Sequence, residues 1–370
     1  MTESISKGKK ENLRIFKDLE KEVIQENLCC ACGACIAYCE SQSFDVIELD
    51  GYTPKFKSEA NEENCKECGL CYFICPQTKT LEELLSQQLS IQDELGHIKD
   101  ILAAKTTQEQ IKKVGQDGGV VTTILYHLFE RNKIDAAVVS KYDENQHPKP
   151  EIIYNKEELI DSAGTRYSIS PQILPLKDLY NIPQQIQAEK GLYDIDQLRV
   201  AFVGTPCQVK ALRKMQTLSI KPAHVVKYLI SLFCFENFNY KELFDTIKEK
   251  KGIEPSEIQK CFIKGNFFIE TEDGKKSELN IKDLDSAVRN HCTVCDDFTG
   301  RYSDISVGST GAPEKFSLIL TRTENGDNLI KNLLSQQFIE QYIHPRDKEA
   351  NWKEKRKKKL KDMISFKKSK

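Results

Sequence analysis

Short apolar runs set between polar turns predict strands and helices in the second two thirds of the chain. Runs rich in branched and aromatic side chains predict buried strands at 134–140, 151–154, 198–203, 224–233, 303–309 and 316–323. Helical spacing is expected after Gly119, through Leu125, Leu128 and Phe129, and again over 208–215. Open α/β sheets bind ligands at the carboxyl ends of their strands. We therefore expect a mixed α/β domain with its site at that edge.

Residues 81–114 show a helical pattern instead. Leu84, Leu85, Leu89 and Ile91 form an apolar face, which is interrupted near Gly96. This segment is predicted to be a connecting helix between two domains. The residues before it, 1–28, are polar and are expected to begin as a loosely packed helix.

The composition is typical of a globular protein, and we expect the protein to stay in the cytoplasm. Of the 370 residues 30% are charged and 39% hydrophobic, the net charge is -2, and no run approaches the roughly 18–20 apolar residues of a membrane span. Residues 1–21 lack the apolar core of a secretory signal. Cytoplasmic thiols are kept reduced, so the 14 cysteines are expected to bind metal rather than form disulfides. The charge balance gives no reason to expect nucleic acid.

Two cysteine motifs near the N-terminus carry the strongest signal. Both have the spacing C-x2-C-x2-C-x3-C, at Cys29, Cys32, Cys35 and Cys39, and at Cys65, Cys68, Cys71 and Cys75. In two-cluster ferredoxins the fourth cysteine of such a run ligates the other cluster. The predicted 4Fe-4S ligand sets are therefore Cys29, Cys32, Cys35 and Cys75 for cluster 1, and Cys65, Cys68, Cys71 and Cys39 for cluster 2. A pair of zinc sites is the alternative. Cys30 fits neither set and is interpreted as a bystander.

Four further cysteines stand apart from these motifs: two lie at the ends of predicted strands, and two are close together in the sequence. Cys207 follows the strand 198–203 at the mouth of a helix, Cys234 ends the strand 224–233, and Cys292 and Cys295 form a C-x2-C pair. These four cysteines are enough to bind one more 4Fe-4S cluster, provided that the strands are neighbours in the sheet. Cys261 lies on an alternating strand and is interpreted as structural.

Three loops have residue types that suit ligand binding. Residues 115–122 place glycines before a helix, which presents free backbone N–H groups to an anion or a ring carbonyl. Residues 308–311 are a second loop, in which glycines allow a ligand to approach the backbone closely. Residues 164–168 set a cation beside an aromatic ring, for which a solvated turn is the simpler interpretation. The basic run 355–359 suits a solvated helix face, or docking to an acidic partner or to anionic headgroups at the cytoplasmic face of a membrane complex.

Four of these segments together resemble one known family. They are GQDGGVVT at 115–122, GTPCQVKALR at 204–213, LFC at 232–234, and the pair at 292–298 with DISVGS at 304–309. They resemble the coenzyme F420-reducing hydrogenase beta-subunit family, which includes the input subunit of the F420H2 dehydrogenase of methanogenic archaea. The resemblance spans roughly 29–323. The two-cluster head is more similar to the dehydrogenase subunit than to the hydrogenase subunit.

The resemblance implies bound FAD, a third 4Fe-4S cluster and coenzyme F420 as substrate. The implied ligands of the third cluster are Cys207, Cys234, Cys292 and Cys295. The implied FAD contacts are Gln116, Asp117, Gly118, Gly119, Val120, Thr122, Thr205, Gly308 and Ser309. The implied F420 contacts are Thr165, Arg166 and Tyr167, where the family's Gly-Ser-Lys-Tyr is matched by 164–167 with arginine for lysine. The chain has no G-x-G-x-x-G, so the flavin expectation rests on the resemblance.

The expected organisation has four parts. Residues 1–80 form a ferredoxin-like domain with two 4Fe-4S clusters, and 81–114 form the connecting helix. Residues 115–343 form a mixed α/β catalytic domain for FAD and F420 with the third cluster, and 344–370 form a basic C-terminal tail.

The expected function is a flavin and iron–sulfur oxidoreductase that oxidises reduced F420, or runs in reverse. Hydride goes to FAD, and single electrons then pass through the clusters to a redox partner such as hydrogenase, dehydrogenase or reductase subunits. No side chain is assigned a catalytic role. The alternatives are a non-catalytic iron–sulfur electron-transfer subunit and a relative that acts on another donor or acceptor, such as ferredoxin or a sulfite reductase module.

Overall fold

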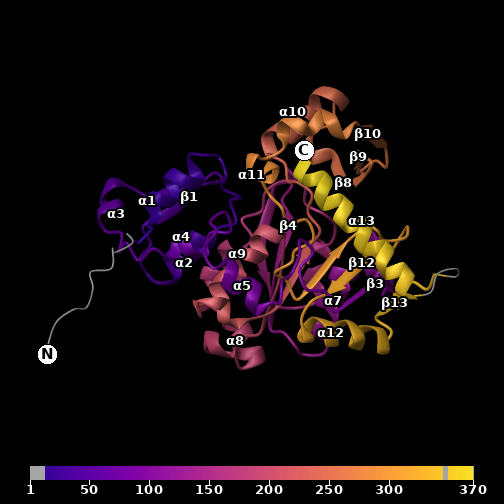
Figure 1. Ribbon diagram of the computed structural model, residues 1–370, viewed down its shortest axis with the longest axis horizontal. Coiled ribbons are helices and arrows are strands. Elements are labelled where there is room, and N and C mark those ends of the chain that lie inside the picture. The colour runs from indigo at the N-terminus through magenta and orange to yellow at the C-terminus, as the bar shows by residue number, and fades with distance from the viewer. Residues whose placement is uncertain (1–12, 345–348, 370) are drawn as a thin grey trace.

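A mixed eight-stranded sheet forms the centre of the protein (Figure 1). The computed structural model describes residues 13–344 and 349–369. The strand order is β13-β3-β12-β11-β7-β6-β4-β5. The strands are β3 (Asp100–Thr106), β4 (Ala136–Tyr142), β5 (Pro148–Ile153), β6 (Val200–Gly204), β7 (Val226–Leu232), β11 (Ile305–Gly308), β12 (Ser317–Thr321) and β13 (Ile339–Gln341). The four neighbours β11, β7, β6 and β4 run parallel, so their carboxyl ends share one edge.

Helices cover both faces of this sheet. One face packs against α7 (Val120–Glu130) and α12 (Glu324–Ser335). The other packs against α9 (Pro206–Thr217) at the β6 side and α13 (Glu349–Ser369) at the β3 side. Alternate strand residues reach opposite faces, as Ile101 and Leu102 of β3 do. The remaining helices of this body are α5 (Glu82–Gln88), α6 (Glu109–Val114), α8 (Gln184–Lys190), η2 (Glu157–Ser162), η3 (Leu174–Tyr180), η4 (Ile195–Gln197) and η5 (Ala223–Val225).

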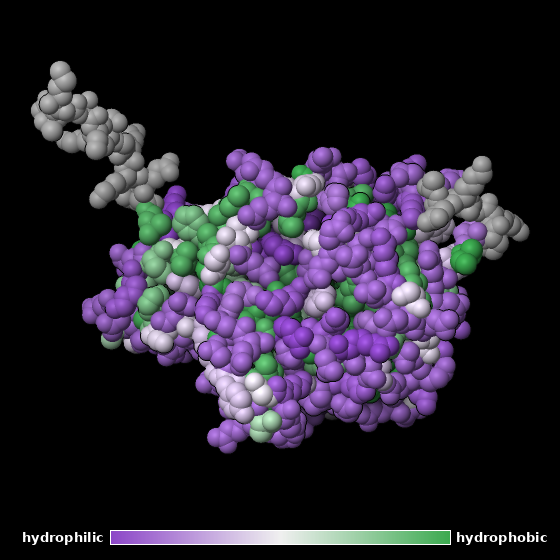
Figure 2. Space-filling model, turned by 90° about the horizontal axis from the view of Figure 1, so that it is seen from below, coloured by the Kyte–Doolittle hydropathy of each residue, from purple (hydrophilic) through white to green (hydrophobic). Residues whose placement is uncertain are grey.

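The N-terminal cysteine-rich unit lies to one side of the body (Figure 1). It consists of α1 (Phe16–Leu19), η1 (Glu20–Ile24), α2 (Ala34–Ser41), β1 (Ile47–Asp50), β2 (Thr53–Phe56), α3 (Glu59–Glu63) and α4 (Leu70–Ile74). Phe16, Leu19 and Val23 are buried, so the expected loose packing of residues 1–28 is wrong from Phe16 onward; residues 1–12 lie outside the described part. On the face drawn in Figure 2 hydrophobic side chains gather toward this end of a largely hydrophilic surface.

Buried polar contacts attach the unit to the body. Lys214 of α9 is fully buried, and its ammonium donates to the carbonyl oxygens of Cys75 at 2.6 Å and Thr78 at 2.9 Å. The Arg289 guanidinium donates to the Cys29 carbonyl at 2.8 Å. Both contacts end on the loops that carry cysteines, which fixes these loops relative to the sheet.

A smaller sheet is inserted between β7 and β11. It has the order β10-β9-β8, from β8 (Ile258–Lys264), β9 (Asn266–Thr271) and β10 (Lys276–Leu279). The helices around it are α10 (Tyr240–Lys251), η6 (Pro255–Glu257), η7 (Ile281–Ala287) and α11 (Asn290–Thr293). Its own core includes Phe238, Phe267 and Leu284. Within the insert, β9 and β10 pair antiparallel as a hairpin whose turn includes Asp273 and Gly274.

The connecting helix expected at 81–114 is wrong over most of its length. Only α5 and α6 are helical, and between them β3 runs through the main sheet. The run Ile101, Leu102, Ala103 and Ala104 is buried on both faces of the sheet. A continuous apolar run of this length suits a strand covered on both sides, and its lack of alternation hides it from a search for periodicity.

The expected basic tail is a packed helix. Trp352, Leu360 and Ile364 of α13 are buried against Ile101, Ala103, Leu318 and Leu320. Its lysines pair within the chain: Lys353 lies 2.7 Å from Asp100, and Lys361 lies 2.8 Å from Asp93. Residues 345–348 and 370 of the expected tail lie outside the described part. Among the helices in the described part, none has the length and apolarity to cross a bilayer.

Truncating the core side of α13 is expected to destabilise the body. Leu360→Ala removes a fully buried side chain that faces β3 and β12, and should lower the free energy of unfolding by about 2–4 kcal/mol. Lys359→Ala, on the neighbouring exposed residue, is the matched control and should cost less than about 0.5 kcal/mol. Urea unfolding followed by circular dichroism measures both. Equal, small effects in the two variants would contradict the packing of α13.

Candidate functional site

The carboxyl edge of the parallel strands holds Cys207 at the start of α9. Thr205 is the N-cap residue, and its backbone N–H donates to Gln208 Oε1 at 2.8 Å, a capping box, while Pro206 occupies the first helical turn. A Cβ on Gly204 would lie 2.6 Å from the Phe202 ring, so glycine allows the strand to turn here. The turn therefore presents Cys207 at the helix mouth, with its sulfur 3.2 Å from Thr205 Oγ1.

The other three cysteines of this set come from the two ends of the insert. Cys234 follows β7, and its N–H donates to the Phe298 carbonyl at 2.9 Å. Cys292 lies in α11, and its sulfur accepts from the Asn237 N–H at 3.3 Å. Cys207, Cys234, Cys292 and Cys295 all line one cavity of about 770 Å3. The structure thus brings together the four cysteines that the sequence leaves scattered.

These thiols lie in a buried environment beside one cation. Burial raises the pKa of Cys292 to about 12 and also raises those of Cys234 and Cys295. The ammonium of Lys367, from the last turn of α13, opposes this effect at each of them. Burial lowers the pKa of Lys367 itself, but the Cys234, Cys295 and Cys292 thiolates outweigh it, and the net direction is upward.

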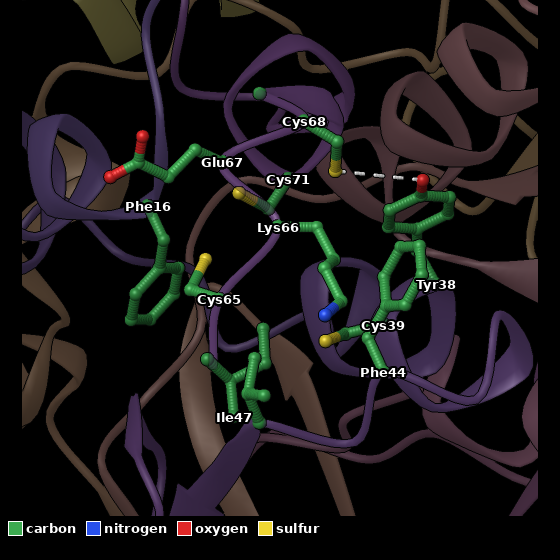
Figure 3. Close-up of a pocket in the computed structure, with 12 residues that line it drawn as sticks. Phe16, Tyr38, Cys39, Phe44, Ile47, Cys65, Lys66, Glu67, Cys68 and Cys71 are labelled. Atoms are coloured by element: carbon green, nitrogen blue, oxygen red, sulfur yellow. Dashed lines mark hydrogen bonds between the residues drawn. The ribbon is translucent and has the colours of Figure 1, made fainter. Parts of the chain in front are cut away.

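The second N-terminal set surrounds a small separate cavity. Figure 3 shows Cys39, from the first motif, facing the same space as Cys65, Cys68 and Cys71 from the second. The Tyr38 hydroxyl lies 3.7 Å from the Cys68 sulfur, and Lys66 extends toward Cys39 in this view. Gly33 and Gly69 both adopt left-handed backbone conformations before the helices α2 and α4. The two motifs therefore have matching local structure.

The first set lies between that cavity and the body. Burial raises the pKa of Cys35, and the Cys29 and Cys75 thiolates raise it further. Burial raises the pKa of Cys75 to about 11, with Cys29 adding to it. Cys30 is buried between Cys32 and Cys207 and lines the large cavity. Interpreting Cys30 as a bystander missed this position, which only the docking of the unit on the body creates.

Among the described residues no group of three or more His, Cys, Asp or Glu side chains converges closely enough to hold a single metal ion. The cysteines of the second and third sets instead line cavities. A 4Fe-4S cube binds one thiolate at each of four irons, so its ligands are spread around a body of several atoms. The four thiols on the wall of each cavity are the donor chemistry that such a cube needs.

The large cavity extends from the third cysteine set to the glycine-rich loop before α7. It is lined by Gln116, Asp117, Gly119, Val120, Thr122, Thr205, Gly308 and Ser309. Gly119 has a φ of +65° and caps the amino end of α7. Gly118 is absent from the lining: its N–H donates to Ser317 Oγ at 3.1 Å, and its carbonyl accepts from Thr106 at 2.7 Å. A Cβ on Gly118 would lie 2.5 Å from the Ala104 carbonyl oxygen, so glycine here allows close packing on β3.

The loop 164–168 lines the same cavity and is not a solvated turn. The Arg166 guanidinium donates to the carbonyls of Ala163 at 2.7 Å and Asp161 at 3.2 Å, and lies 4.5 Å from the centre of the Tyr142 ring. The Tyr167 hydroxyl accepts from the Ile263 N–H at 3.1 Å and from Gln116 Nε2 at 3.4 Å. Its own proton is then directed away from both donors.

Three buried polar atoms of the cavity wall have no hydrogen-bond partner within the described chain. They are Gln116 Oε1, Arg166 Nε and Ser168 Oγ. Buried polar atoms are rarely left unpaired, because each costs about 1–3 kcal/mol. One acceptor, one donor and one hydroxyl around a large cavity are what a polar ring ligand would satisfy. The residues present therefore fit a flavin-sized group.

Sequence reasoning missed the parts of the wall that come from distant elements. Met363, Phe366 and Lys367 of α13 line the cavity, as do Ile281 and Lys282 of η7. A signal for α13 was present, because Trp352, Leu360 and Ile364 recur at multiples of four residues, but the surrounding lysines obscured it. Nothing in the local sequence around 281–282 indicates a binding site.

Two segments of the chain match one family. Residues 101–177 match the N-terminal part of "Coenzyme F420 hydrogenase/dehydrogenase, beta subunit", and residues 197–344 match its C-terminal part. A subunit of the F(420)H(2) dehydrogenase of Methanosarcina mazei is 32% identical, over 83% of this chain and 82% of its own length. The beta subunit of the coenzyme F420 hydrogenase of Methanothermobacter thermautotrophicus is 33% identical, over 66% of this chain and 85% of its own length.

A solved structure agrees with these matches. A chain of the F420-reducing [NiFe] hydrogenase complex from Methanosarcina barkeri superposes with a TM-score of 0.62 and 28% identity, over 74% of this chain and 93% of that one. The resemblance inferred from the sequence is thus confirmed, and the relatives are oxidoreductase subunits. The chain belongs to the coenzyme F420 hydrogenase/dehydrogenase beta-subunit family.

Proposed function

We propose that this protein is a flavin and iron–sulfur oxidoreductase subunit that exchanges electrons between coenzyme F420 and a redox partner. The observation that carries the proposal is the single cavity at the carboxyl edge of the sheet. It is lined by the third cysteine set, by the loop before α7 and by the loop 164–168. A site for a hydride donor, a site for a ring cofactor and a set of cluster ligands then share one chamber.

The residues of the chamber have separate tasks in this proposal. Gln116, Val120 and Thr122 hold FAD at the amino end of α7, where backbone N–H groups favour an anion. Arg166 and Tyr167 hold the anionic deazaflavin, with the Arg166 head fixed by two carbonyls. When bound, FAD would accept a hydride and release single electrons. The chain's contribution is to orient the two rings and to exclude water.

The position of the N-terminal unit supports an order for electron transfer. Cys29 and Cys30 are electrostatic neighbours of Cys207, so the first set lies beside the third. The second set lies beyond the first, and its members Cys65 and Cys68 are partly exposed. We infer the order third cluster, cluster 1 and cluster 2, with the redox partner reached from cluster 2.

Anaerobic addition of reduced F420 tests the proposal. The purified protein should show flavin absorbance that bleaches within one turnover, followed by bleaching of the cluster absorbance. Flavin that bleaches without the clusters would remove the electron-transfer part. Protein that lacks flavin but whose clusters accept electrons from dithionite would instead be the non-catalytic electron-transfer subunit.

Arg166→Ala is expected to weaken the binding of F420. A charge-assisted hydrogen bond contributes about 1.5–3 kcal/mol, so the KM for reduced F420 should rise roughly 10- to 100-fold. Reduction of the clusters by dithionite should be unchanged. Arg131→Ala removes the same charge at the opposite end of α7 and is the control. An unchanged KM in Arg166→Ala would show that the loop 164–168 is not the substrate site.

A further inference from the structure

The last turn of α13 places one ammonium group inside the chamber of the third cysteine set. Lys367 is 4% exposed, and its Nζ donates to the Cys234 carbonyl at 3.0 Å. The same Nζ lies 3.5 Å from the Asp297 carbonyl. One carbonyl belongs to a cysteine of the set, and the other follows Cys295 by two residues. The cation is thus held by the two loops that present the cysteines.

Packing fixes this ammonium in place. Leu360 and Ile364 anchor the preceding turns of α13 to the sheet, and Lys361 is paired with Asp93. The neighbouring Phe366 ring lies 5.6 Å from the Phe235 ring, which follows Cys234. Because α13 is docked on the sheet, the ammonium stays in one place. Its field is also screened less by salt than the field of a charge on a solvated side chain.

A buried ammonium needs more than two neutral carbonyls to offset its loss of hydration. The third cysteine set supplies the negative charge. Lys367 lines the same cavity as all four of its members, Cys207, Cys234, Cys292 and Cys295. It is therefore placed to act on the set as a whole and not on one ligand.

We propose that the buried ammonium of Lys367 raises the reduction potential of the cluster on Cys207, Cys234, Cys292 and Cys295. The proposal rests on the proposed function. A nearby positive charge stabilises the more negative, reduced form of a cluster, and burial strengthens the effect. α13 lies beyond both segments that match the family, so this tuning comes from the chain's own C-terminal helix.

The test is an anaerobic redox titration followed by electron paramagnetic resonance, with iron content measured on the same samples. Lys367→Met and Lys367→Gln should lower the midpoint potential of the third cluster, while Lys367→Arg should leave it near the wild-type value. Lys368→Met is the matched control: it removes the same charge from the next residue, whose side chain is 46% exposed, and should leave the midpoint unchanged. The shift in Lys367→Met should persist at high salt, because the charge is buried.

The outcomes separate this inference from the proposed function. Wild-type protein should carry about twelve irons, four for each cube. A wild-type value near eight means that the third cluster is absent, which overturns both. Twelve irons with the same midpoint in both neutral variants, or an equal shift in Lys368→Met, overturns the role of Lys367 alone. If Lys367→Met loses iron, the midpoint potential of Lys367→Gln is used instead, because glutamine still donates to carbonyls. A lowered midpoint in Lys367→Gln then supports the role of Lys367, and an unchanged midpoint overturns it.

Discussion

Cys292→Ser should stop electron transfer out of the chamber while the flavin is still reduced. Cys292 lies in α11, whereas the loop before α7 belongs to another element, so the serine leaves the proposed flavin contacts of that loop in place. Reduced F420 should bleach the flavin once. Steady transfer to an artificial acceptor that takes electrons from the N-terminal unit should fall by more than about 100-fold, beyond the usual cost of losing a residue that only supports a metal site.

Stopped-flow absorbance and steady-state turnover measure the two events separately. Cys261→Ser is the control, because Cys261 lies on β8 and belongs to none of the three sets. Full steady turnover in Cys292→Ser would remove the third set from the electron path. Loss of flavin from the purified variant would show that the serine disturbs the chamber more widely.

Cys75→Ser should remove the cluster assigned to the first motif and spare the other. The Cys75 thiol is an electrostatic neighbour of Cys29, whereas Cys39 shares its cavity with Cys65, Cys68 and Cys71. The variant should lose about four irons together with the spectroscopic signal of the first-motif cluster. Transfer between the third cluster and cluster 2 should then fall sharply, because the middle of the path is missing.

Cys39→Ser is the reciprocal variant and should remove the second-motif cluster. The two variants should therefore lose different signals and equal amounts of iron. The opposite pairing, in which Cys75→Ser loses the second-motif signal, would mean that each motif supplies all four ligands of its own cluster.

Strands of the parallel centre could be predicted because local composition decides them. The runs that form β4, β6, β7 and β11 are apolar and are bounded by turn residues. β3 and β13 were not predicted as strands, for two different reasons. β3 follows a helical pattern without a clear break, and β13 is three residues long and forms only by pairing with β3. Short edge strands depend on tertiary contacts that local sequence does not encode.

The site could be predicted where spacing or a turn limits the chemistry. The doubled cysteine motif and the turn before α9 belong to this class. The lining of the chamber by Lys282 and Lys367 does not, because it depends on how the insert and α13 dock on the sheet. Gly118 shows that close packing can also require a glycine in the loop before α7, which the local sequence does not reveal.

The insert between β7 and β11 leaves and returns to the sheet through a closed stem. The Asn239 N–H donates to the Ala287 carbonyl at 2.8 Å, and the Arg289 N–H to the Asn237 carbonyl at 3.1 Å, so its two ends lie side by side. Chain added at the distant hairpin around Gly274 then costs little, since doubling a loop adds only about 0.6 kcal/mol of closure entropy. The insert also carries Lys282 of the cavity wall. Its sequence can therefore change, and with it this part of the cavity wall, while the register of the central strands stays the same.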